Sequence, residues 1–200
     1  MGKFVLHEYS KRVYEPKQMI TFSKNSAASQ MDIDEEMKLH IGEPVVQVSN
    51  LTQAEFDYFV SKYADGFEAI YFFQNTNVKD LTALSQLKNV KYLLFYNVRA
   101  ASLWDMSRND RLCGIMISDS KKMIYNLEPL QYAPNMEELL LFSSAFSKYP
   151  VKTISPLKKC PKLKRLFMEF NTEDKSFCPE EFDFLDVFQY QCDRKKNFLY

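Results

Sequence analysis

The sequence predicts an α/β solenoid, in which short repeats build a parallel β-sheet and pack one helical turn each against it. Three observations predict this fold. Apolar residues recur at fixed positions in five segments, and these segments start about two dozen residues apart. A polar residue followed by two apolar residues precedes four of the segments at a constant distance. Self-similarity at a period of about 20–50 residues is the sequence signature of a solenoid.

The five segments have apolar residues at positions 1, 4, 6 and usually 9, and they start 23, 22, 24 and 27 residues apart. Alternation of this kind is typical of a strand, because successive side chains of a strand point to opposite faces. We therefore expect each segment to contain one strand of the sheet. The segments are FEAIYFFQN from Phe67, VKYLLFYNV from Val90, LCGIMISDS from Leu112, MEELLLFSS from Met136 and LKRLFMEFN from Leu163.

A short helical turn is expected before each of the last four segments. An aliphatic residue stands nine residues before each segment, and another apolar residue follows three positions later. This spacing gives a helical or 3₁₀ turn one buried face. The residue before each aliphatic one is of a type that caps helices by accepting a backbone N–H. The caps are Asp80, Ser102, Asn126 and Thr153, and the apolar pairs are Leu81 and Leu84, Leu103 and Met106, Leu127 and Leu130, and Ile154 and Leu157.

This pattern resembles the leucine-rich-repeat family, in particular short bacterial members with repeats of about 22–24 residues. The first and last segments end in Asn75 and Asn171, which completes the family pattern L-x-x-L-x-L-x-x-N. The resemblance covers roughly residues 45–193. It implies a short horseshoe, with the parallel sheet on the concave face and the helical turns on the convex face. The alternative is a set of unrelated amphipathic segments in an ordinary α/β domain.

The repeats at residues 67–171 need closed ends, because a solenoid exposes apolar surface at both termini. Residues 44–66 are expected to be a modified first repeat, with a strand at Val45–Val48 and a capping box from Thr52 to Glu55 that starts a helix. Residues 172–200 are expected to be a degenerate closing repeat, in which Leu185, Phe188 and Tyr190 keep the apolar spacing, followed by a tail.

Residues 1–43 do not fit the period. The stretches Lys3–Tyr9 and Met19–Ser23 are compatible with a strand hairpin, and Asn25–Asp34 has the composition of a loop. This region is expected to be a terminal cap or a cover across the sheet.

The composition argues against several classes of protein. Lys plus Arg and Asp plus Glu both number 26, so the net charge of zero lacks the basic footprint of a nucleic-acid binder. No apolar stretch approaches the roughly 20 residues of a membrane helix, and the N-terminus does not resemble a signal peptide. We expect a cytoplasmic protein whose four separated cysteines are reduced thiols.

Motifs for catalysis or cofactor binding do not occur in the sequence. There is no P-loop, no G-x-S-x-G and no dinucleotide-binding glycine pattern, and His7 and His40 lack metal-ligand spacing. Cys178 has no identifiable base beside it in the sequence. The sequence therefore predicts a protein that is not an enzyme and that holds no cofactor or metal.

The expected concave face is rich in aromatic residues. Pattern positions 3, 5 and 7 point to that face, and so many large side chains exceed the apolar patch of a few hundred Å² that monomers usually expose. We expect a protein partner there, and a cognate inhibitor such as a bacterial immunity protein is one family-level interpretation. The candidate partner-binding residues are Tyr71, Phe73, Tyr92, Leu94, Tyr96, Met116, Leu140, Phe142, Arg165 and Phe167.

Two alternatives stay open for this face. Residues 1–43 or the C-terminal tail would cover it and make it a second core, or a second copy of the chain would cover it in a weak homodimer. An open face predicts that Leu140→Glu folds normally and loses the partner. A covered face predicts that the same substitution unfolds the protein.

Overall fold

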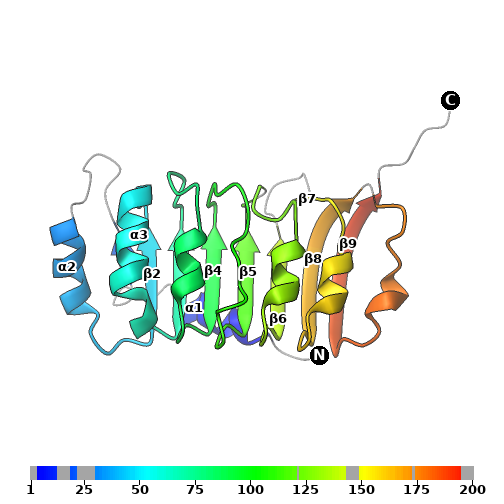
Figure 1. Ribbon diagram of the computed structural model, residues 1–200, viewed down its shortest axis with the longest axis horizontal. Coiled ribbons are helices and arrows are strands. Elements are labelled where there is room, and N and C mark those ends of the chain that lie inside the picture. The colour runs from blue at the N-terminus through cyan, green and yellow to red at the C-terminus, as the bar shows by residue number, and fades with distance from the viewer. Residues whose placement is uncertain are drawn as a thin grey trace.

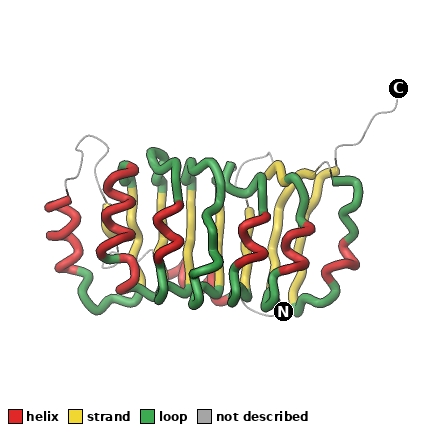
Figure 2. Tube along the Cα trace, in the orientation of Figure 1, coloured by secondary structure: helices red, strands yellow, loops and turns green. Residues whose placement is uncertain are grey.

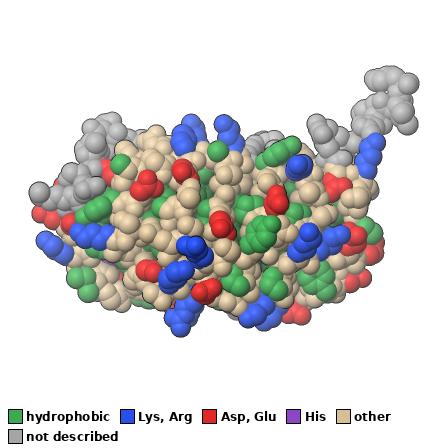
Figure 3. Space-filling view, viewed as in Figure 1, with side chains coloured by type: hydrophobic (Ala, Val, Ile, Leu, Met, Phe, Trp, Pro, Cys, Tyr) green, Lys and Arg blue, Asp and Glu red, His purple; other side chains and the backbone are tan. Residues whose placement is uncertain are grey.

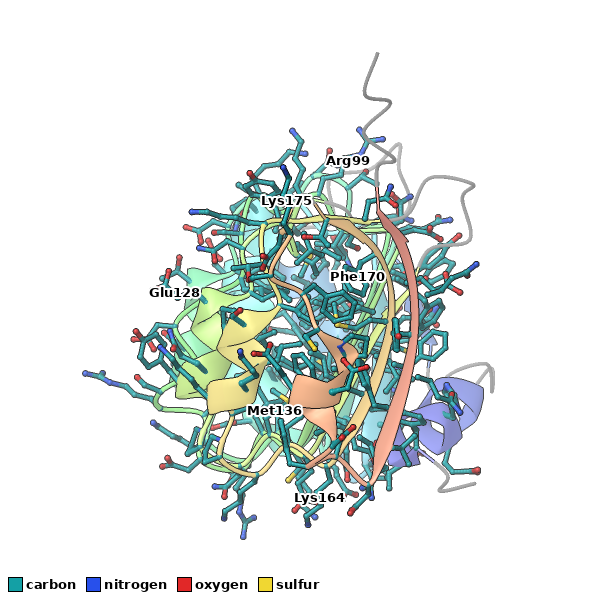
Figure 4. The ribbon with its side chains drawn as sticks, turned by 90° about the vertical axis from the view of Figure 1, so that its right-hand side faces the viewer. Arg99, Glu128, Met136, Lys164, Phe170 and Lys175 are labelled. Atoms are coloured by element: carbon teal, nitrogen blue, oxygen red, sulfur yellow. The ribbon has the colours of Figure 1, made fainter. Side chains whose placement is uncertain are left out.

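The computed structural model describes residues 4–12, 19–21, 30–120, 122–142, 149–172 and 174–194. Its main body is a long parallel sheet with helices packed along one face (Figure 1). The helix α1 (Val5–Arg12) lies on the opposite face, as the view along the sheet shows (Figure 4). The chain therefore forms three layers over part of the sheet.

The sheet contains nine strands of the described chain, and every neighbouring pair is parallel. The strands run in chain order from β1 to β6, and β8 follows β6. The long strand β8 pairs through its first half with β6 and through its second half with β7, and its other edge pairs with β9. The prediction of a parallel sheet is confirmed. The strands are β1 (Met19–Thr21), β2 (Val45–Ser49), β3 (Ala69–Phe73), β4 (Tyr92–Tyr96), β5 (Gly114–Ser118), β6 (Glu138–Phe142), β7 (Tyr149–Val151), β8 (Arg165–Thr172) and β9 (Val187–Arg194).

The repeats stack in register, so that equivalent apolar side chains form continuous rows in the main core. At pattern position 4, Ile70 is paired with Leu93, and the row continues through the next three repeats. These side chains are 0–1% exposed, which is the burial that the spacing predicted. The rest of the row is Ile115, Leu139 and Leu166, and the parallel row at position 6 is Phe72, Phe95, Ile117, Leu141 and Met168.

A residue with left-handed backbone geometry follows each of four successive strands. The residues Asn50, Gln74, Asn97 and Asp119 directly follow β2, β3, β4 and β5 and have φ values of 58°, 54°, 51° and 52°. Asn and Asp tolerate this region because their short polar side chains hydrogen-bond locally. The repeated geometry turns the chain out of the sheet at the same height in each repeat.

Three of the four expected helical turns form, and they lie on one face of the sheet (Figure 2). They are η3 (Thr82–Gln86), η4 (Glu128–Tyr132) and η5 (Ser155–Lys159), all of 3₁₀ type. The turns begin one residue later than expected, with Leu81, Leu127 and Ile154 at their N-cap positions, and each side chain expected to be a cap accepts a hydrogen bond from the backbone N–H two residues later. The backbone nitrogen of Thr82 lies 2.8 Å from Asp80 Oδ1, that of Glu128 lies 3.0 Å from Asn126 Oδ1, and that of Ser155 lies 3.2 Å from Thr153 Oγ1.

The prediction of a helical turn after Ser102 is wrong, because the structure has an irregular turn there. In the other repeats the residue after the aliphatic position is polar, but here it is Trp104, whose side chain is only 4% exposed. Its indole Nε1 donates to Asn109 Oδ1 at 2.8 Å, and Asn109 Nδ2 donates to the carbonyl oxygens of Leu84 and Leu87 in the preceding repeat. Burying the indole with its hydrogen bond satisfied replaces the helical turn by an irregular one.

A strand and a helix or helical turn form in each segment that the sequence assigned to a closing repeat. At one end, α3 (Gln53–Lys62) begins with the predicted capping box, in which Thr52 Oγ1 accepts from the Glu55 N–H and the Glu55 carboxylate accepts from the Thr52 N–H. A 3₁₀ turn, η2 (Ala64–Gly66), follows it. At the other end, β9 continues the register, with Phe188 beside Leu166, after a short 3₁₀ turn η6 (Pro179–Phe182).

The prediction of a strand hairpin from Lys3–Tyr9 and Met19–Ser23 is wrong. Residues from Val5 form α1, and β1 pairs in parallel with β2. The consecutive N–H groups of Val5 and Leu6 both bind one carboxylate, that of Glu138, which suits the start of a helix, where free N–H groups point the same way. In a strand, consecutive N–H groups point in opposite directions.

The loop expected over Asn25–Asp34 is also wrong at its C-terminal end, because α2 (Gln30–Leu39) begins there, while residues 25–29 lie outside the described residues. Ile33 and Met37, one helical turn apart, are 0% and 4% exposed and belong to the main core. The helix therefore closes the end of the core, which the weak apolar spacing of this stretch did not show.

Cysteine chemistry provides a test of this fold. Cys160 is 4% exposed, and its burial raises the pKa of the thiol to about 12, while Cys178 is exposed. Because the thiolate is the reactive form, iodoacetamide at pH 8 should modify native Cys160 far more slowly than Cys178, and should modify both after denaturation in urea. Peptide mass spectrometry after timed quenching measures both rates. Equal rates in the native protein would contradict the burial of Cys160 at the end of η5.

Candidate functional site

The face of the sheet opposite the helical turns carries pattern positions 3, 5 and 7, and we call it the ladder face. All ten candidate partner-binding residues lie on it, on strands β3, β4, β5, β6 and β8. The side chains at position 5 form a hydrophobic cluster separate from the main core. The structure therefore brings the ten candidate residues together on one face.

The N-terminal helix α1 covers the centre of the ladder face. Leu6 of α1 is completely buried and belongs to the same cluster as the position-5 side chains. Tyr71, Leu94, Met116 and Leu140 are 3%, 0%, 4% and 0% exposed. The expectation of an open face is wrong at these four residues, because the chain's own N-terminal segment fills the place that was assigned to a partner.

A buried carboxylate holds α1 in this position. Glu138, at position 3 of β6, is 1% exposed, and its two oxygens accept the N–H groups of Val5 at 3.0 Å and Leu6 at 3.1 Å. Arg165 on the neighbouring strand donates its Nε to Glu138 Oε1 at 2.6 Å, and its Nη2 lies at the same distance. A negative charge is favourable at the start of a helix, and the Arg165 guanidinium balances it. Burial of this glutamate is tolerated because its lone pairs are satisfied.

A glycine makes room for the helix. A Cβ atom on Gly114, at position 3 of β5, would lie 3.1 Å from Leu6 Cδ1 and 2.9 Å from Tyr92 Cδ1. The absence of a side chain at Gly114 therefore lets Leu6 pack onto the sheet. Beside it the ring of Tyr9 lies 4.5 Å from that of Tyr92, and burial raises the pKa of the Tyr92 hydroxyl to about 12. The tyrosine thus stays neutral and forms part of the seat of the helix.

Aromatic side chains beside the covered centre stay half-exposed. We call Phe73, Tyr96, Phe142 and Phe167 the aromatic border. The rings of Phe73 and Tyr96 stack at 5.0 Å with an angle of 13°, and those of Phe142 and Phe167 lie 6.3 Å apart in an edge-to-face arrangement. Rings that pack against one another keep their orientation, so this border offers a preorganised apolar surface.

The candidate residues therefore divide into two groups. Tyr71, Tyr92, Leu94, Met116, Leu140 and Arg165 build the seat of α1, and the four residues of the aromatic border keep accessible surface. Sequence reasoning missed Glu138 and Gly114 as functional positions. The available signal was at position 3, where Gly114 has no side chain and Glu138 is followed in the next repeat by a residue of opposite charge, Arg165.

Other kinds of site are not evident in the described part of the chain. None of its helices is long and apolar enough to cross a membrane. Its His, Cys, Asp and Glu residues form no cluster that could hold a metal ion. The helical face mixes positive, negative and apolar side chains and has no extended field of one sign (Figure 3).

Comparison with known proteins places the chain in a family. Residues 5–108, which run from the start of α1 to the irregular turn after β4, match the model of a domain of unknown function, DUF4848. The chain belongs to the DUF4848 family. No curated protein matches it. Among solved structures, this DUF4848 protein is similar to internalin C2 of Listeria monocytogenes, with 14% sequence identity, a TM-score of 0.37 and coverage of 82% of this chain and 84% of that chain.

The two sides of the sheet should contribute similarly to the stability of this DUF4848 protein. Leu139 faces the main core and Leu140 faces α1, and both are completely buried. Each substitution by alanine should lower the free energy of unfolding by about 2–5 kcal/mol. Urea unfolding measures the change, with Leu39→Ala as the control because Leu39 is 76% exposed. A loss for Leu140→Ala as small as the control's would mean that the ladder face is open.

Removing the carboxylate of Glu138 should release α1. Glu138→Ala leaves two helix N–H groups and the partly buried Arg165 guanidinium without their acceptor, so we expect a loss of about 2–4 kcal/mol. Urea unfolding measures the loss, and hydrogen exchange at Val5 and Leu6 should become faster. The matched control is Glu137→Ala, because Glu137 is a partly exposed neighbour that pairs with Lys164 and should contribute less than about 1 kcal/mol. Equal effects of both substitutions would show that Glu138 does not anchor the helix.

Proposed function

We propose that this protein is a non-catalytic binding module that holds a protein partner through the aromatic border of its ladder face. We also infer that the chain is a leucine-rich-repeat protein, a short horseshoe with the ladder face on its concave side and the helical turns on its convex side. The in-register repeats and the Asn75 and Asn171 positions support this narrower interpretation of the fold.

The observation that carries the proposal is the partial exposure of four aromatic rings that pack in pairs on the sheet. Tyr and Phe are enriched at the centres of protein interfaces, where they contribute large contact area at low entropic cost. The border lies beside α1, so a partner would contact the edge of the helix and the rings together. A cognate inhibitor that occupies another protein is the form of this function that we favour.

A second candidate function is favoured by the cover itself. A face that α1 fills supports the interpretation that the ladder face is mainly a second core, in a structural or self-associating protein. The two functions differ in solution, because a self-associating protein should show a mass that rises with concentration. Sedimentation of the full chain at increasing concentration, without any partner, distinguishes them.

Substitution in the aromatic border tests the binding function. Tyr96→Asp places a charge among half-exposed rings and should weaken partner binding about 30-fold or more, since loss of an interface anchor typically costs at least about 2 kcal/mol. The matched control is Tyr125→Asp, because Tyr125 is 54% exposed and lies in the turn before η4, away from the ladder face. Affinity capture from the native cell, quantified for both variants and the unmodified chain, measures the difference. If both variants capture the partner as well as the unmodified chain does, or if both lose it to the same extent, the aromatic border is not the binding site.

A further inference from the structure

A cavity of about 480 Å³ lies between α2 and the end of α3. The helix α2 lies at the end of the sheet opposite β9 (Figure 1). The size of the cavity falls within the roughly 300–1,000 Å³ typical of small-molecule sites. One wall is a single face of α2 and its following turn, because Asp34, Met37, Lys38 and Ile41 are spaced as i, i+3, i+4 and i+7. The other wall is formed by the end of α3 and the turn after it, with Tyr63 and Phe67.

A buried histidine with an unused ring nitrogen lines this cavity. His40 is 6% exposed, and its Nδ1 forms no hydrogen bond with any residue in the described part of the chain. A buried polar atom without a partner is unfavourable, and such atoms are rare in folded proteins. On either side of it, Leu39 and Ile41 are 76% and 82% exposed. The turn after α2 thus buries the polar His40 Nδ1 and exposes the apolar side chains of Leu39 and Ile41. It ends at Gly42, whose φ of +87° favours a glycine.

The charges around the cavity favour an anion. The one carboxylate in its lining, that of Asp34, is already saturated by Lys62 Nζ at 2.8 Å and by the hydroxyls of Tyr58 at 2.8 Å and Tyr63 at 2.5 Å. The hydrogen bond from Lys62, followed by that from Tyr63, lowers the pKa of Asp34 to about 2, so this charge stays balanced by Lys62. Lys38 forms no ion pair with the residues that the structure describes, and it is the cation left over.

We propose that this cavity binds a small apolar monocarboxylic acid. The hydrocarbon part packs on Met37, Phe67 and the exposed Ile41, which removes apolar surface from water. The carboxylate accepts a hydrogen bond from His40 Nδ1 and pairs with Lys38, so that the unused ring nitrogen and the unpaired cation are both satisfied. The site lies among α2, α3 and the turns after them, and does not depend on the aromatic border or its partner.

The two histidines of the chain make a direct test possible. Sodium octanoate is titrated into the full chain while the imidazole signals of His40 and His7 are followed by NMR. His7 is exposed on α1 and serves as the internal reference. We expect saturable shifts of the His40 signals only, and binding of 1-octanol at least about tenfold weaker, because it lacks the carboxylate. Unchanged His40 signals at millimolar octanoate, or equal affinities for the acid and the alcohol, would overturn the proposal.

Paired variants test the two polar contacts separately. Lys38→Glu should weaken octanoate binding about tenfold or more, whereas Lys159→Glu, another exposed lysine located in η5, should leave it unchanged. His40→Asn and His40→Phe should each weaken it, and the loss for phenylalanine should be the larger because it cannot donate a hydrogen bond. If the histidine variants do not fold, the comparison of the two lysine variants decides. Octanoate bound equally well by Lys38→Glu and Lys159→Glu would refute the site.

Discussion

The alignment of equivalent residues across the parallel strands is the constraint on which the structure depends. Pairing in register places Phe72 beside Phe95, whose rings stack 5.5 Å apart at an angle of 16°, and it aligns the aliphatic side chains that continue this row. Each strand must then start and end at the same height. The left-handed residues at the strand ends and the constant return from helical turn to strand meet this requirement. Length changes between repeats are absorbed in the segments that leave the strands.

The irregular turn after β4 shows how the alignment survives a local exception. Trp104 enters the core where the other repeats have a polar residue, and the helical turn is lost there. The side-chain amide of Asn109 connects this turn to the preceding repeat in place of a helical turn. It accepts a hydrogen bond from the Trp104 indole and donates hydrogen bonds to the carbonyl oxygens of Leu84 and Leu87. The strands on both sides keep their register. A side-chain network thus replaces secondary structure without disturbing the sheet.

The main core is built from contacts between neighbouring repeats, whereas the ladder face is covered by α1, a segment far away in the sequence. Glu138 fixes the start of α1, Gly114 leaves space for Leu6, and the position-5 side chains become a second core. On the ladder face, this closure leaves the aromatic border partly exposed beside the helix. A partner on the border would contact elements whose position depends on one buried carboxylate. Under the proposed function, binding at the border and the anchoring of α1 would be coupled through Glu138.

The sequence by itself determined the parallel sheet, its register, the main core and three of four helical turns. These features follow from local spacing, because periodic apolar residues and capping side chains such as Asp80 act within one repeat or between neighbouring repeats. It also determined which residues share the ladder face. Only the tertiary structure decided that α1 is a helix and that it covers Leu94 and Leu140, because the contacts responsible join residues more than 100 positions apart. A carboxylate on β6 selects the conformation of Val5 and Leu6, and no local pattern in the first dozen residues contains that information.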